Sequence, residues 1–212
     1  MIAERCFDDR SEASRAASDF ISNALISQLK TAEKASLVVS GGSTPMECFS
    51  LLSRKSLPWE RIQVTLTDER RVPPEDPHSN EGRVRKNLLV ARAAESQLVA
   101  LDAAELEAMP RPFACTLVGM GEDGHFASLF SDASNLGAAL DLQNPALCLP
   151  VETAASPYIR NSMTLSCLLQ SRVILLLVFG EAKRRILEAP ESYPVGHLLG
   201  QTKTPVEVFW SP

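Results

Sequence analysis

The sequence predicts an α/β protein with a three-layer α/β/α arrangement, in which helices cover both faces of a mostly parallel, Rossmann-like sheet. Short apolar runs that end at glycine or charged residues alternate with segments of helical periodicity along most of the chain. Apolar residues make up 45% of the 212 residues and charged residues 22%, which suits one sizeable core. Because the chain shows no repeat and no clear linker, we expect a single domain over residues 1–212.

Strands are predicted where apolar runs are short and closed by turn residues. The clearest is the run at 173–179, which Gly180 ends, and the weakest is 146–151. The other predicted strands are 37–40, 62–67, 98–101, 113–118 and 206–210.

Helices are predicted between these runs. Residues 11–34 place apolar side chains at a spacing of three to four, and Pro45 suits the first turn of a helix over 45–53. Ser79 or Asn80 is expected to cap a helix that ends near Leu89. The remaining predicted helices are 164–170 and 181–188.

Charge and cysteine usage narrow the possible partners. The net charge of −5 provides no global basic field, so we expect neither nucleic acid nor a membrane as a partner. The longest apolar run, 173–179, is too short to span a bilayer, and the first nine residues do not resemble a signal peptide.

Five widely spaced cysteines without a C-x-x-C pair predict free buried thiols in a reducing compartment. We therefore expect a cytoplasmic protein that is a monomer or a weak homo-oligomer.

Polar, glycine-containing segments follow four of the predicted strands. Ligands of open parallel sheets bind beyond the carboxyl ends of the strands, so these segments are expected to converge on one site. They begin at residues 40, 67, 119 and 180.

The first of these segments, 40–45 (SGGSTP), predicts an anion-binding turn. Gly41 and Gly42 let the backbone approach a ligand, and Ser43 and Thr44 add hydroxyl donors ahead of a helix. An ordinary tight turn with a capping side chain remains the alternative. The segment is neither a P-loop nor a dinucleotide fingerprint.

Two cations are candidates for pairing with a bound phosphate. Lys183 lies one turn into the helix after Gly180, and Arg160 precedes the helix predicted over 164–170. Arginine can bind phosphate through two parallel hydrogen bonds. Alternatively, both side chains are solvated surface charges.

The loop after residue 118 contains the best candidate for proton transfer. His125 can exchange a proton near neutral pH, and Asp123 can orient its ring. A capping or core histidine is the alternative interpretation. Of the other histidines, His78 is expected to be exposed and His197 to be structural. No spacing typical of metal ligands is present, and no cysteine or G-x-S-x-G serine offers a nucleophile.

Together these motifs resemble the glucosamine-6-phosphate isomerase/6-phosphogluconolactonase family, in the same order from about residue 36 to the end. The segments that carry the resemblance are 40–45 (SGGSTP), 68–73 (DERRVP) followed by Ser79 and Asn80, 119–130 (GMGEDGHFASLF), 160–165 (RNSMTL), 179–183 (FGEAK) and 204–210 (TPVEVFW). The second segment and the continuation ASLF resemble the lactonase branch more than the deaminase branch. Arg71, Ser131 and Asn161 depart from the usual family pattern.

The resemblance implies a three-layer fold, no metal or organic cofactor, and hydrolysis of 6-phospho-D-glucono-1,5-lactone in the oxidative pentose phosphate pathway. It also implies site residues: Gly42, Ser43, Thr44, Arg160 and Lys183 would hold the phosphate. The lactone would be surrounded by Asp68, Arg70, Asp123 and His125. His125 would then activate water, and Arg70 or backbone N–H groups would stabilise the oxyanion.

Two alternative functions belong to the same phosphate-binding framework. A glucosamine-6-phosphate deaminase or related sugar-phosphate isomerase would use an acidic residue shortly after the histidine, but residues 126–131 contain no carboxylate and the first is Asp132. A non-catalytic sugar-phosphate sensor would usually carry a DNA-binding segment, for which few residues precede Ser36.

Overall fold

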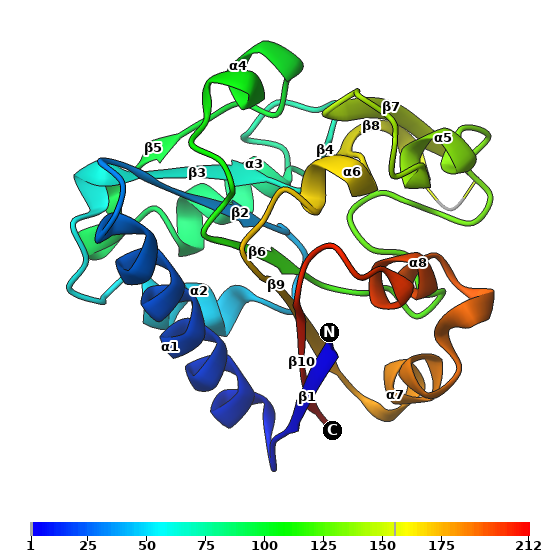
Figure 1. The fold of residues 1–212 in the computed structure, drawn as a ribbon, viewed down its shortest axis with the longest axis horizontal. Coiled ribbons are helices and arrows are strands. Elements are labelled where there is room, and N and C mark those ends of the chain that lie inside the picture. Colours follow the sequence, from blue (N-terminus) through cyan, green and yellow to red (C-terminus); the bar gives the residue numbers. More distant parts are fainter. Residues whose placement is uncertain (1, 155) are drawn as a thin grey trace.

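The computed structural model describes residues 2–154 and 156–212, which form two β-sheets with helices around them (Figure 1). The larger sheet has seven strands in the order β1-β10-β9-β6-β2-β3-β5, and all its neighbouring strands run parallel. Its strands are β1 (Ile2–Cys6), β2 (Ala35–Val39), β3 (Ile62–Leu66), β5 (Gln97–Leu98), β6 (Cys115–Val118), β9 (Ile174–Phe179) and β10 (Val206–Ser211). This sheet confirms the predicted mostly parallel α/β class.

A smaller antiparallel sheet lies beside the carboxyl end of β3. It consists of β4 (Asp68–Arg70), β8 (Ser156–Met163) and β7 (Cys148–Thr153), in the order β4-β8-β7. Thr67 joins β3 to β4, and its main chain bonds both to Val39 of β2 and to Met163 of β8. Asp68 therefore lies where the chain passes from one sheet to the other.

Helices surround the larger sheet, with α1 on one side and α7 and α8 on the other (Figure 1). The helices are α1 (Arg10–Leu29), α2 (Met46–Leu52), α3 (Asn80–Asn87), α4 (Ala103–Ala108), α5 (Leu136–Leu140), α6 (Leu165–Leu168), α7 (Glu181–Glu188) and α8 (Pro194–Gly200). Short 3₁₀ turns add η1 (Trp59–Arg61), η2 (Ala91–Glu95) and η3 (Pro190–Ser192).

The core forms because the central strands are apolar on both faces. All residues of β2 are buried, and so is every residue of β9 except Phe179. Helix α1 buries Ala13, Ala17, Ile21 and Leu25, a spacing of four that places them on one face. Asp9 caps this helix by accepting the backbone N–H of Glu12.

Several predicted elements were wrong in extent or place. The first helix ends at Leu29 rather than residue 34, and the helix predicted over 164–170 covers only Leu165–Leu168. The weak strand predicted over 146–151 is β7 of the antiparallel sheet and is not part of the parallel one. Strands β1, β4 and β8 and helices α4, α5 and α8 were not predicted.

The prediction that all five thiols are buried was only partly right. Cys48, Cys115 and Cys167 are buried, Cys148 is half-buried, and Cys6 is exposed on the edge strand β1; all five are free. Burial raises the pKa of Cys115 and of Cys167 to about 12. In the described part of the chain, no helix is both long and apolar enough to cross a membrane.

Candidate active site

A cavity of about 160 Å³ lies where the segments after β2, β3, β6 and β9 meet. The structure thus brings together residues from all four of the predicted strand-end segments. Its lining residues are Ser40, Gly42, Ser43, Thr44, Pro45, Asp68, Arg70, Asn80, Gly119, Met120, Gly121, His125, Ala127, Arg160 and Lys183. Eight of the ten predicted site residues are among them; of the other two, Gly41 lies between two lining residues and Asp123 contacts the lining residue His125.

The turn between β2 and α2 forms one wall of the cavity. Gly42 and Ser43 are exposed, and Thr44 is half-buried. Gly41 is buried against α3, where a Cβ atom would stand 2.4 Å from the Cβ of Asn80. Only glycine therefore allows the start of this turn to pack so closely on α3.

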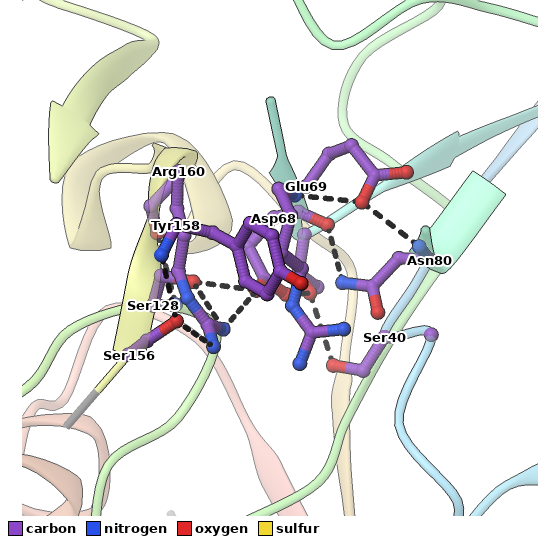
Figure 2. Close-up of polar contacts among 12 residues, drawn as sticks. Ser40, Asp68, Glu69, Asn80, Ser128, Ser156, Tyr158 and Arg160 are labelled. Atoms are coloured by element: carbon purple, nitrogen blue, oxygen red, sulfur yellow. Dashed lines mark hydrogen bonds and ion pairs between the residues drawn. The ribbon is translucent and has the colours of Figure 1, made fainter. Parts of the chain in front are cut away.

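Asp68 is the buried carboxylate of the site, with 5% of its surface exposed. One carboxylate oxygen accepts the Thr67 hydroxyl at 2.9 Å, and the other accepts the Ser128 hydroxyl at 2.6 Å. The Arg160 guanidinium lies 3.7 Å from the second oxygen. Figure 2 shows this network, with Ser128 and Arg160 on one side of Asp68 and Ser40 and Asn80 on the other.

Arg160 was expected in a loop before a helix, but it lies on β8 and is buried. Its side chain donates to the hydroxyls of Ser128 and Ser156 and lies over the ring of Phe130, 5.1 Å from the ring centre. Burial lowers the pKa of Arg160, and the charge of Arg70 lowers it further, while Asp68 and Glu69 raise it. Arg160 is thus a desolvated cation that faces the cavity.

Arg70 reaches the cavity from β4. Its Nη1 donates to the carbonyl oxygen of His78 at 2.5 Å, so its orientation is fixed by the proline-rich loop. Among the described residues, its buried Nε has no hydrogen-bond partner.

The loop after β6 holds His125 at the cavity wall. Asp123 Oδ1 lies 2.5 Å from His125 Nδ1, and the Phe130 ring lies against the imidazole with 4.0 Å between ring centres. A Cβ on Gly121 would stand 2.3 Å from the imidazole, so this position must remain glycine. Burial alone would raise the pKa of Asp123, but the hydrogen bond and charge of His125 outweigh it and lower that pKa.

Lys183 enters the cavity from the first turn of α7. It is half-buried, and this burial lowers its pKa, while the nearby Glu122 carboxylate acts in the opposite direction. The positive charge of Lys183 is thus poorly solvated and available to an anion.

Sequence reasoning missed residues that organise the site through their partners. The Glu69 carboxylate accepts the backbone N–H groups of Asn80 and Glu81 and the Ser79 hydroxyl at the start of α3. Ser128 bridges Asp68 and Arg160. Glu69 and Ser128 both lie inside the motifs that carry the family resemblance. Their position in these motifs is the sequence signal from which a capping or bridging role could have been predicted.

The other histidines lie outside the cavity. His78 is exposed, as predicted, and its ring stacks on Tyr158 of β8 with 5.1 Å between ring centres. His197 was expected to be structural, but its side chain on α8 is exposed. Within residues 2–154 and 156–212, no three His, Cys, Asp or Glu side chains are grouped so that they could hold a metal ion.

Arg71 and Asn161, two of the residues that depart from the family pattern, contact each other. The Arg71 guanidinium, just after β4, donates to the side-chain oxygen of Asn161 on β8 at 3.1 Å. The two substitutions thus add a contact between the strands that carry Arg70 and Arg160.

Comparisons with known proteins match almost the whole chain. The 6-phosphogluconolactonase of Mesorhizobium japonicum is 34% identical over 97% of this chain and 94% of its own length. That of Caulobacter vibrioides is 34% identical over 99% of this chain and 97% of its own. The crystal structure of a 6-phosphogluconolactonase from Shewanella baltica superposes with a TM-score of 0.95 at 36% identity, covering 100% of this chain and 98% of that one.

The same assignment follows from the family model of glucosamine-6-phosphate isomerases/6-phosphogluconolactonase, which matches residues 8–209. The predicted family is therefore confirmed over almost the whole chain. The chain belongs to the glucosamine-6-phosphate isomerase/6-phosphogluconolactonase family.

Proposed function

We propose that this chain hydrolyses 6-phospho-D-glucono-1,5-lactone to 6-phosphogluconate, with His125 as the general base. The relatives that match over their full length are 6-phosphogluconolactonases, which supports this substrate. The observation that carries the mechanism is one cavity lined by an imidazole, by Lys183 and by two arginines.

The tautomer of His125 follows from its partner. The Asp123 carboxylate can only accept a hydrogen bond, so the proton lies on His125 Nδ1 and the lone pair on Nε2. Nε2 takes a proton from water as its oxygen attacks the lactone carbonyl carbon. The same proton then passes to the ring oxygen as the ester bond breaks, and the carboxylate product forms.

The phosphate end of the substrate is bound by Lys183 and the turn at Gly42, Ser43 and Thr44, with Arg160 as a second cation. Because the phosphate is remote from the carbonyl carbon, its binding energy can hold the reacting carbon beside His125. Arg70 then stabilises the negative charge that develops on the carbonyl oxygen.

A deaminase function is less consistent with the loop after His125. Its first carboxylate, Asp132, lies outside the cavity lining and accepts hydrogen bonds from the Thr153 hydroxyl and the Ala154 backbone N–H, which lower its pKa. No carboxylate precedes it in residues 126–131. The monomeric glucosamine-6-phosphate deaminase superposes with a TM-score of 0.68 at 19% identity, which shows a shared fold alone.

The same proposal extends to where and how the protein acts. The free thiols on Cys48, Cys115 and Cys167 support a reducing, cytoplasmic location. The acidic net charge supports a small anionic substrate held by local cations, and no nucleic-acid partner. We expect it to act as a monomer or weak homo-oligomer in the oxidative pentose phosphate pathway, without a cofactor.

The activity is tested by generating fresh 6-phosphogluconolactone and following its loss with and without the protein. The wild type should exceed spontaneous hydrolysis, and His125→Ala should lower kcat by about 10²–10⁴-fold with little change in KM. His197→Ala, an exposed histidine outside the cavity, is the matched control and should retain wild-type rates. Near wild-type turnover in His125→Ala would exclude the proposed base, and ammonia release from glucosamine 6-phosphate would support the deaminase.

A further inference from the structure

Ser40 is a lining residue of the cavity to which the mechanism above gives no role. It ends β2, and its side chain is more than nine-tenths buried. Its hydroxyl lies 3.0 Å from the Thr67 hydroxyl. The direction of this hydrogen bond decides what Ser40 can offer a ligand.

The direction is set by Asp68. The Thr67 hydroxyl lies 2.9 Å from Asp68 Oδ1, and a carboxylate can only accept, so Thr67 donates its single proton there. Thr67 can then only accept from Ser40, which uses the Ser40 proton. Ser40 Oγ is left with lone pairs and no proton for the cavity, so it can only accept a hydrogen bond from a ligand.

Asn80 gives the same side of the cavity a second acceptor. Its Nδ2 donates to the main-chain oxygen of Asp68 at 2.8 Å, which fixes the amide so that Oδ1 points elsewhere. Asn80 is 3% exposed, and its Oδ1 has no hydrogen-bond partner among the described residues. The side chain packs against Gly41, the residue that follows Ser40.

The cations that line the cavity, Arg70, Arg160 and Lys183, can only donate, and the Ser43 and Thr44 hydroxyls can donate as well. Both carboxylate oxygens of Asp68 already accept hydrogen bonds within the protein. A phosphate and a lactone carbonyl can only accept, so they match these donors and cannot bond to Ser40. On a phosphorylated sugar lactone, only the ring hydroxyls can donate a hydrogen bond. On this substrate, the partner of Ser40 Oγ and Asn80 Oδ1 must therefore be a ring hydroxyl.

We propose that Ser40 Oγ, beside Asn80 Oδ1, accepts a hydrogen bond from a ring hydroxyl of the substrate and so selects the hydroxylated lactone over a deoxy form. This inference rests on the proposed function, because it uses the donors and acceptors of a phosphorylated sugar lactone. A site with buried polar groups discriminates against a ligand that leaves them unpaired.

The test compares kcat/KM for the lactone with that for its 2-deoxy, 3-deoxy and 4-deoxy forms, corrected for spontaneous hydrolysis. In the wild type, loss of the hydroxyl that Ser40 binds should lower kcat/KM by about three- to tenfold, as for one neutral hydrogen bond. Ser40→Ala should lower kcat/KM for the intact lactone by a similar factor. It should show no further loss with that one deoxy substrate, while its losses with the others match those of the wild type.

Thr67→Val is the control variant: it removes the Ser40–Thr67 hydrogen bond, and with it the hydrogen bond from Thr67 to Asp68, but keeps Ser40 Oγ, which can still accept from a ring hydroxyl. It should retain the wild-type discrimination between the intact and deoxy lactones, even if its overall rate falls. If the deoxy penalties of Ser40→Ala equal those of the wild type, Ser40 has only a structural role and the inference is wrong. Absence of any hydrolysis of the intact lactone by the wild type would instead overturn the proposed function.

Discussion

The imidazole of His125 is fixed from three directions at once. Asp123 holds Nδ1, Phe130 lies against one face of the ring, and Gly121 leaves the space that the ring edge occupies. Phe130 also lies under the Arg160 guanidinium, so one aromatic ring positions both the base and a cation.

Lys183 should contribute to substrate binding more than to turnover. Lys183→Ala should raise KM for the lactone about tenfold or more, as for a hydrogen bond to a charged group, with a smaller effect on kcat. Lys183→Arg keeps a cation and should recover part of this loss. A decrease in kcat without any change in KM in Lys183→Ala would contradict a phosphate contact.

The same lysine predicts a pH dependence of binding. Burial lowers the pKa of Lys183, so its charge is lost as the pH rises through a value below the ordinary 10.5. Affinity for 6-phosphogluconate should therefore start to fall at lower pH than for an ordinary lysine. Calorimetric titration should show this fall in the wild type and not in Lys183→Arg, whose guanidinium stays charged.

At the scale of single residues, the sequence predicted the groups with their own chemistry and missed those that act through partners. His125, Asp68 and Lys183 could be named because they follow apolar strands in polar segments. The roles of Glu69 and Ser128 depend on contacts with α3 and with Asp68 and Arg160, residues far away in the chain. Local pattern does not encode such contacts.

Helix α3 depends on a carboxylate from another element. The N-terminal N–H groups of a helix lack partners within the helix, and Glu69 on β4 accepts those of Asn80 and Glu81. Ser79 also caps the helix by accepting the N–H of Gly82. This anchors α3 against Gly41 and so fixes the rear of the turn that we propose to bind the phosphate.

Removal of this cap should destabilise the protein. Glu69→Ala should cost about 1–3 kcal/mol, because it leaves buried or half-buried donors unpaired. Glu81→Ala is the matched control, since that carboxylate pairs with the exposed side chain of Arg85 and its loss should cost less than about 0.5 kcal/mol. Urea unfolding of the two variants measures the difference in the free energy of unfolding. Equal losses in the two variants would show that the Glu69 cap does not stabilise the protein more than a surface ion pair does.

Among the elements, prediction succeeded for buried strands and failed for the smaller sheet. Runs such as 173–179 are apolar because the parallel sheet is covered on both faces. Strand β8 includes Pro157, Arg160 and Asn161, a pattern that local propensity assigns to a loop. It forms because Asp68–Arg70 pairs with it from a distant part of the chain, and Cys148–Thr153, the strand just before it, pairs with its other edge. Strand β1 is exposed throughout and carries no apolar signal.

The whole molecule builds its cavity from segments that are far apart in the chain, so the ligand should protect them together. We expect 6-phosphogluconate to slow amide hydrogen exchange at 40–45, 68–71, 119–126 and 180–183 in parallel, and to raise Tm with ligand concentration. The segment 103–108, which is α4 and contributes no lining residue, is the internal control. Protection confined to one segment would contradict a single shared site.

The pairing of β1 with β10 has a consequence for how the chain is made. Ile2 pairs with Val206 and Cys6 with Trp210, so the first strand has no partner in the sheet until the last one has been synthesised. During synthesis on the ribosome, the central strands can assemble first, while the emerging amino-terminal strand waits for almost the entire chain. If the ribosome stalls before residue 206, both β1 and the outer edge of β9 stay without a neighbouring strand. Such exposed strand edges can pair with other nascent chains and aggregate.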